Sequence, residues 1–202
     1  MKMPDLINKK VIIAEKRIIE LIQSGDLKSL SETEKYQISK FYEAKSMNRL
    51  ETAKIIYSAS NTSEGYKDYS EVVAAAYYSM YYIVHSFLAL SYKIKLREEL
   101  RGVHAITEYA ILYYLVKTNR LAKHLYEEYV KAFETTAQIQ KINIEDFKEK
   151  AYGYAEQYSK SRSARETFTY NVTPIVEKFN AENAIKSAEE FINTIRQVMM
   201  PR

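Results

Sequence analysis

The segment from Val72 to Leu90 is apolar on almost every side, and this run constrains the fold more than any other feature of the sequence. A helix without a polar face is buried inside a protein or spans a membrane. Polar residues and tyrosines lie near its middle, whereas the tyrosines of membrane spans prefer the interfaces. We therefore expect a buried helix at the centre of a bundle, in a soluble, cytoplasmic chain that has no membrane contact.

Apolar residues recur at helical spacing through most of the chain, and several helix boundaries carry capping residues. Ser31 and Asp68 each stand three residues before a glutamate, which is the pattern of a capping box. Asn119 is expected to cap another helix, and Gly25 to end the first. The predicted helices cover 5–23, 31–60, 69–95, 103–117, 120–140, a stretch from 143 that carries Phe147 and Tyr158, and 181–199.

No stretch alternates as a strand, so the sequence predicts an all-α fold without a sheet. We expect one helical domain over 1–202, with 5–25 as an accessory N-terminal helix. The buried faces are predicted to include Ile22 in the first helix and Phe41 in the second.

The composition excludes several classes of site. With no Cys and three His, the chain has no disulfide, no thiolate zinc site and no cysteine nucleophile, and no Gly-rich phosphate loop is present. We expect neither a cofactor nor a bound metal. The net charge of +4 permits contact with nucleic acid without demanding it. Abundant Lys, Glu, Ile and Tyr without Cys would suit a thermophile.

Three segments, taken in order, resemble a known family. They are "AAAYYSMYYIVHSFLAL" (74–90), "RGVHAITEYAILYYLVK" (101–117) and "SRSARETFTYNVTP" (161–174), which "NAENAIKSAEEFINTI" (180–195) follows. Together they are similar to the HEPN domain superfamily, in particular to its small prokaryotic members, over roughly 40–198. The resemblance implies a bundle of four or five helices that forms a homodimer. Many such proteins are metal-independent RNases of toxin–antitoxin or defence systems, and others pair with a small nucleotidyltransferase.

The resemblance also places candidate site residues. Arg165 matches the arginine of the family's RNase motif, with Glu166 as the polar residue after it. The motif histidine would fall at Tyr170, Asn171 or Val172, and none of these is His. A phenol with a pKa near 10 is a poor base at neutral pH, so we expect the usual cleavage chemistry to be missing. His104 matches a histidine that opens the helix after the central one.

Each candidate also has a purely structural interpretation, and the sequence leaves these alternatives open. Arg165 could anchor a phosphate or form a salt bridge at a helix end. Tyr170 and Asn171 could line a nucleotide groove or pack at the end of the bundle. Lys160 and Arg162 belong to a basic cluster that could attract a phosphate backbone or simply be solvated, as could Arg101.

The histidines and the central tyrosines have two interpretations as well. We expect His104 to be a surface or capping residue, although a proton shuttle is possible. His85 is predicted to be a satisfied core histidine and His124 to be exposed. The four tyrosines of the central helix favour packing over a base-stacking platform; they are Tyr77, Tyr78, Tyr81 and Tyr82.

Three functions remain as hypotheses. The first is a HEPN-like protein of a defence or toxin–antitoxin type that binds nucleic acid or nucleotides without the usual RNase activity. The second is a metal-independent RNase that uses Arg165 with His104 or Tyr170. The third is a non-catalytic helical partner subunit of a small nucleotidyltransferase. We also expect a homodimer, because the central helix is too apolar for a thin bundle to cover easily.

Overall fold

The chain folds as an all-α helical bundle, as the periodicity of the sequence predicts. The computed structural model describes residues 3–97, 100–139 and 176–200. Within these ranges its helices are α1 (Met3–Gln23), α2 (Glu32–Thr62), α3 (Tyr69–Tyr92), α4 (Val103–Ile111), α5 (Lys123–Ile139) and α8 (Lys178–Met199), and a π-helical turn, η1 (Leu112–Val116), extends α4.

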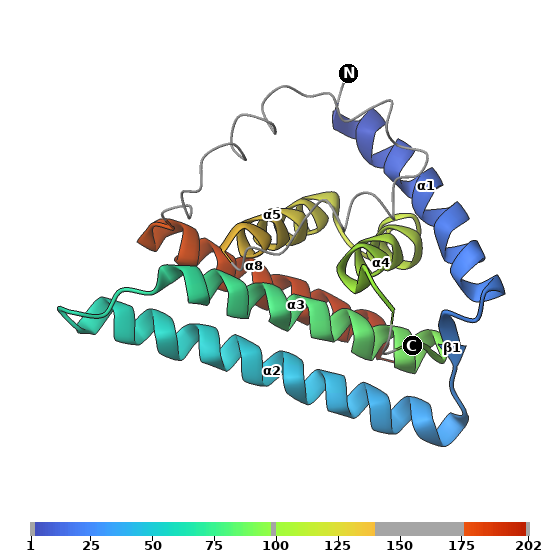
Figure 1. Ribbon diagram of the computed structural model, residues 1–202, viewed down its shortest axis with the longest axis horizontal. Coiled ribbons are helices and arrows are strands. Elements are labelled where there is room, and N and C mark those ends of the chain that lie inside the picture. The colour runs from blue at the N-terminus through green and yellow to red at the C-terminus, as the bar shows by residue number, and fades with distance from the viewer. Residues whose placement is uncertain (1–2, 98–99, 140–175, 201–202) are drawn as a thin grey trace.

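Helix α3 is the centre of the bundle. It lies between α2 on one side and α5 and α8 on the other (Figure 1). In length and composition it is the one helix of the described ranges that could cross a membrane, but 83% of its most apolar window is buried within the bundle. Three consecutive alanines at 74–76 are completely buried, which lets neighbouring helices approach closely. The prediction of a buried central helix is confirmed.

Helices α2 and α3 form a long antiparallel hairpin joined by polar contacts inside the interface (Figure 1). The Ser39 and Ser86 hydroxyls lie 2.9 Å apart, and the Ser46 hydroxyl donates to the carbonyl of Ser79 at 2.7 Å. Serines at these positions are small and bonded, so the two backbones can lie close without leaving a polar group unsatisfied. The capping box at Ser31 is present in full.

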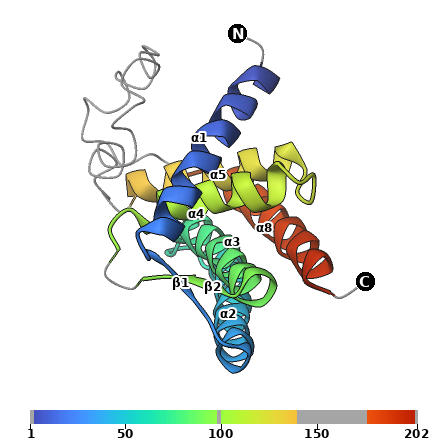
Figure 2. The same cartoon turned by 90° about the vertical axis from the view of Figure 1, so that its right-hand side faces the viewer.

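Helix α1 packs across α4 and η1 (Figure 2). Its inward residues are Ile7, Ala14, Ile18 and Leu21. Lys10 reaches Glu108 on α4 at 3.3 Å, and the same carboxylate accepts a hydrogen bond from Tyr126 of α5 at 2.6 Å. The predicted inward position of Ile22 is wrong, because this residue is 51% exposed at the end of the packed face.

A small antiparallel sheet corrects the prediction that the chain has none. Strands β1 (Leu27–Ser29) and β2 (Ile94–Leu96) pair with Leu27 opposite Leu96, and both leucines are buried. Three residues per strand are too few to produce an alternating pattern that can be recognised. The sheet ties the link between α1 and α2 to the link between α3 and α4.

Asn119 ends a helix instead of starting one. Its φ angle is +55°, and its amide donates to the Val116 carbonyl at 3.1 Å. Asparagine tolerates the left-handed conformation, so the same residue type serves both ends of helices. Helix α5 begins four residues later, at Lys123. The segment from 143 and the third resembling segment, 161–174, lie outside the described residues.

Candidate functional site: a tyrosine–histidine cluster beside a cationic face

The first turn of α4 is joined to the middle of α3 by a tyrosine–histidine pair. The hydroxyl of Tyr77 lies 2.7 Å from Nδ1 of His104 and 3.5 Å from the hydroxyl of Tyr129 on α5. Burial lowers the pKa of His104 to about 4 and raises the pKa of Tyr77 well above its usual value. At neutral pH both groups are therefore uncharged.

Aromatic rings surround this pair. The ring of His104 lies 5.0 Å from that of Tyr81 and stacks on Phe133 at 5.7 Å, and the ring of Tyr78 meets it edge-on at 6.1 Å. Such contacts favour the neutral imidazole because they replace water around it. The prediction that His104 is a surface or capping residue is wrong, since the side chain is a half-buried member of an aromatic cluster.

His85 lies deeper in the same region and is hydrogen-bonded through Nε2. Its Nε2 is 3.1 Å from the hydroxyl of Thr107, which itself donates to the carbonyl of Val103 at 2.7 Å. Because that hydroxyl has one proton, Nε2 of His85 is the donor in the first bond. Burial, with a smaller effect from His104, lowers the pKa of His85 to about 3. The predicted core histidine is confirmed, as is the exposed position of His124.

Next to this cluster, α2 and α3 present a surface of rings and cations that we call the Tyr–cation face. Tyr82 stacks with Tyr42 at 6.1 Å and with Tyr78 at 6.3 Å. Lys45 lies 5.2 Å from the centre of the Tyr82 ring, and the Arg49 guanidinium 5.9 Å from that of Tyr78. The face comprises Phe41, Tyr42, Lys45 and Arg49 of α2 with Tyr78 and Tyr82 of α3.

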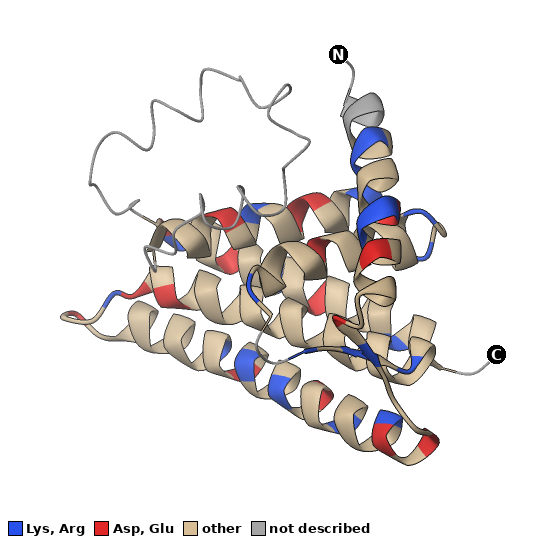
Figure 3. Ribbon diagram, turned by 45° about the vertical axis from the view of Figure 1, so that its right-hand side comes forward, with Lys and Arg blue, Asp and Glu red and all other residues tan. Residues whose placement is uncertain are grey.

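All six residues of this face are accessible at least in part. The three tyrosines are half-buried, both cations are exposed, and Phe41 is 54% exposed with Lys45 4.6 Å above its ring. The predicted inward position of Phe41 is therefore wrong. Figure 3 shows that Lys and Arg recur along α2. Accessible rings with cations beside them offer stacking surfaces and phosphate contacts within one side-chain length of each other.

The sequence contains a signal for this face. Phe41, Lys45 and Arg49 stand at successive intervals of four residues, which places them in one row along a helix. The row lies beside Tyr78 and Tyr82, which are also four residues apart. The apolar type of Phe41 alone favours a core position, whereas the two cations in its row indicate an exposed one.

The other predicted site residues are divided between described and undescribed parts of the chain. Arg101 is exposed, three residues before His104 and just ahead of α4. The rest lie outside the described residues, so their meeting with His104 stays a prediction; they are Arg165, Tyr170, Asn171, Arg162 and Lys160. In the described ranges no group of three or more His, Asp or Glu residues could hold a metal ion.

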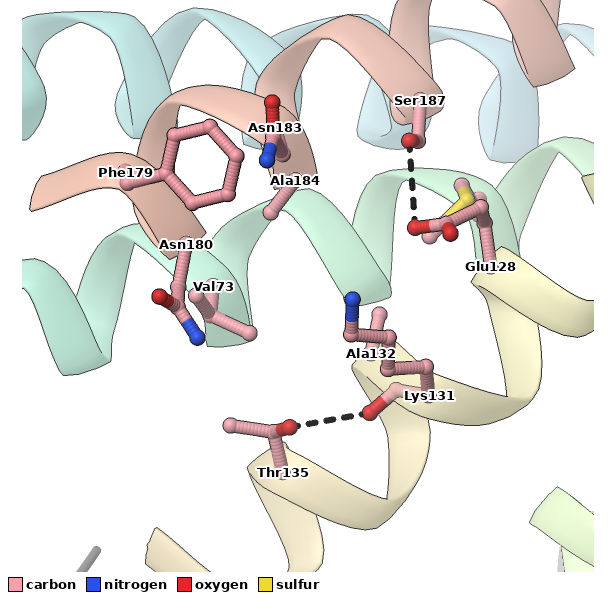
Figure 4. A pocket seen from close by; sticks show the side chains of 11 residues that line it. Val73, Glu128, Lys131, Ala132, Thr135, Phe179, Asn180, Asn183, Ala184 and Ser187 are labelled. Carbon is pink, nitrogen blue, oxygen red and sulfur yellow. Dashed lines mark hydrogen bonds between the residues drawn. The ribbon is translucent and has the colours of Figure 1, made fainter. Parts of the chain in front are cut away.

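A separate groove lies between α5 and α8 (Figure 4). Its polar lining includes Lys131, Asn180 and Asn183, and the hydroxyl of Ser187 lies 3.4 Å from the Glu128 carboxylate. The exposed ring of Phe179 stands at its edge. These side chains come from exposed or half-buried positions, and no histidine is among them. We assign no chemistry to this groove.

No protein-family model matches the chain, and no curated protein or solved structure shows significant similarity to it.

Proposed function

We propose that the protein binds single-stranded nucleic acid, primarily RNA, or free nucleotides, through the Tyr–cation face. The observation that supports this proposal is the placing of Lys45 and Arg49 over the accessible rings of Tyr82 and Tyr78. Bases of any sequence stack on aromatic side chains, and neighbouring cations contact the phosphates. A face of this kind fits a flexible strand better than a duplex, whose bases are already stacked.

The resemblance to the HEPN superfamily agrees with this proposal and extends it. In this view the chain is a cytoplasmic homodimer of a defence or toxin–antitoxin type, and Arg165 adds a phosphate anchor to the nucleic-acid contact.

Cleavage of the bound strand is not part of the proposal. A general acid for the leaving oxygen must carry a proton at the working pH. His104, with a pKa of about 4, is neutral at pH 7 and has Nδ1 engaged by Tyr77. With so low a pKa the imidazole is also a weak base for the ribose 2′-hydroxyl, so the geometry supports a packing role better than a catalytic one.

The proposal is tested by fluorescence anisotropy with a labelled single-stranded RNA at several salt concentrations. The double variant K45E/R49E should weaken binding by at least about tenfold and lower the slope of affinity against salt, because two phosphate contacts are lost. The matched control is K28E/K67E, which changes the net charge equally at two exposed positions away from the face.

A second variant separates stacking from charge. Tyr82→Leu keeps the apolar packing of α3 and removes one stacking surface, so it should weaken binding by about fivefold or more with an unchanged salt slope. If K45E/R49E and K28E/K67E weaken binding equally, the contact is non-specific attraction and the face is not the site. If the RNA binds neither the wild type nor any of the variants, the proposed function itself is refuted.

A further inference from the structure

Helix α1 carries a second apolar stripe that faces away from the bundle. Ile12 is 57% exposed, Ile19 is 44% exposed and Ile22 is 51% exposed, although the opposite side of the same helix is packed on α4 and η1. The three isoleucines are spaced by seven and three residues, which is the a/d spacing of a helix that packs against another helix. Grouped exposed isoleucines of this kind mark an interaction surface.

The charges beside this stripe favour a protein partner over a lipid surface. A helix that lies on an anionic membrane has a basic polar face. Here Lys16 and Glu20 stand one turn apart next to the isoleucines, and both are exposed. Glu20 is 2.7 Å from Arg17 of its own helix, whereas Lys16 has no ion-pair partner among the described residues. The mixture of both signs is typical of a helix–helix contact.

The arrangement is complementary to itself in the antiparallel direction. The isoleucine stripe runs from residue 12 to residue 22 and is centred at residue 17, and the Lys16–Glu20 pair is centred at residue 18. These centres differ by about 1.5 Å along the helix axis. A two-fold axis at this level would bring Ile12 of one copy toward Ile22 of the other, and each Lys16 toward the other Glu20.

We infer that α1 is the interface of a homodimer, in which two copies of this helix pack antiparallel through Ile12, Ile19 and Ile22. The apolar α3 is already covered by α2, α5 and α8. The exposed apolar surface that a second copy would cover therefore lies on α1. This inference does not depend on the proposed nucleic-acid binding, because the Tyr–cation face lies on other helices.

The oligomeric state tests the inference directly. Sedimentation velocity of the full chain across the micromolar range should show a dimer for the wild type. Ile19→Lys places a charge near the two-fold axis and should raise the dissociation constant by about tenfold or more. The matched control is Ile55→Lys on α2, where a single isoleucine is 60% exposed, and it should leave the dimer unchanged.

The charge pair offers an independent test with a rescue. Lys16→Glu alone and Glu20→Lys alone each place like charges across the axis, so both should weaken the dimer. The double variant K16E/E20K restores opposite charges and should recover most of the wild-type affinity. In a parallel dimer each of these residues would lie beside the same residue of the other copy, so exchanging the two charges would not restore affinity in this way.

Cross-linking gives the geometry. The chain has no cysteine, so Ile19→Cys introduces one thiol per protomer, and mild oxidation should produce a disulfide-linked dimer that Ile55→Cys does not form. A wild type that is monomeric throughout the range, or an Ile19→Lys variant that remains dimeric, would overturn the inference. So would binding of the monomer to phosphatidylcholine–phosphatidylglycerol vesicles that Ile19→Lys abolishes, because the stripe would then be a lipid contact.

Discussion

The hydroxyl of Tyr77 and Nδ1 of His104, 2.7 Å apart, join the central helix to the first turn of α4 across 27 positions of the chain. Tyr77 is completely buried and His104 is half-buried, so the bond lies at the buried end of the aromatic cluster. A short bond between two neutral groups in such surroundings contributes to stability mainly because either group would be costly to leave without a partner.

The first prediction concerns this bond. Tyr77→Phe removes the hydroxyl and with it the 2.7 Å hydrogen bond to His104 in a largely apolar site, so it should cost about 1–3 kcal/mol of unfolding free energy. Chemical denaturation by circular dichroism measures the loss. His124→Ala is the control, because that side chain is exposed, and it should change stability by about 0.5 kcal/mol at most. Equal losses in the two variants would show that the bond is not stabilising.

The two buried histidines predict how stability depends on pH. Their pKa values in the folded chain, about 3 for His85 and about 4 for His104, lie below the ordinary value of 6.5. Below pH 6.5 the unfolded chain therefore binds protons that the folded chain does not, and stability falls as the pH falls. By pH 5.5 each histidine should account for a loss of about 1 kcal/mol.

Denaturant titrations at pH 7.5 and pH 5.5 measure this effect. His104→Gln has no titrating group at that position, so its loss between the two pH values should be about half that of the wild type. His124→Ala should keep the full wild-type loss. A His104→Gln protein with an unchanged pH dependence would contradict the assignment of this histidine.

The third prediction concerns Arg165, which lies outside the described residues. If the resemblance to HEPN proteins extends to this position, Arg165→Ala should weaken binding of RNA or nucleotide while the melting temperature stays nearly unchanged. Anisotropy and a thermal melt on the same preparation measure both quantities. A variant that unfolds several degrees earlier and binds normally would show that Arg165 is structural.

The fourth prediction concerns the start of α2. Ser31 accepts a hydrogen bond from the amide of Glu34, and the Glu34 carboxylate accepts one from the amide of Ser31 at 2.8 Å. Ser31→Ala breaks the first of these bonds and should cost about 1 kcal/mol, or a fall of about 2–4 °C in melting temperature. Thr33→Ala, at an exposed position two residues later, is the control in the same thermal melt.

Periodicity and caps predicted most of the fold, because they are local properties. The helix boundaries at Gln23, Ser31 and Asp68 follow from residues within one turn of each boundary. The sheet could not be predicted in this way, since Leu27 and Leu96 pair across 69 positions and each strand has three residues. The prediction for Asn119 is wrong because asparagine suits either end of a helix, and the φ angle decides which.

The candidate site was less accessible to sequence reasoning. His104 looked like a surface residue because it opens a helix, but its environment comes from Tyr77, Tyr81 and Phe133 on two other helices. Only the packing of α3 and α5 against α4 determines that burial. The Tyr–cation face likewise needs α2 and α3 side by side in one register before its rings and cations can be related.

The strands β1 and β2 give the α2–α3 hairpin a property that neither helix has alone. The two ends of the segment 27–96 lie side by side, because Leu27 pairs with Leu96. This stretch is therefore closed at its base by the sheet and held along its length by serine contacts, with α5 and α8 packed on the other side of α3. Such a unit can retain its amide protons in hydrogen exchange while the outer helices open and close, so the hairpin would be the slowest-exchanging part of the molecule.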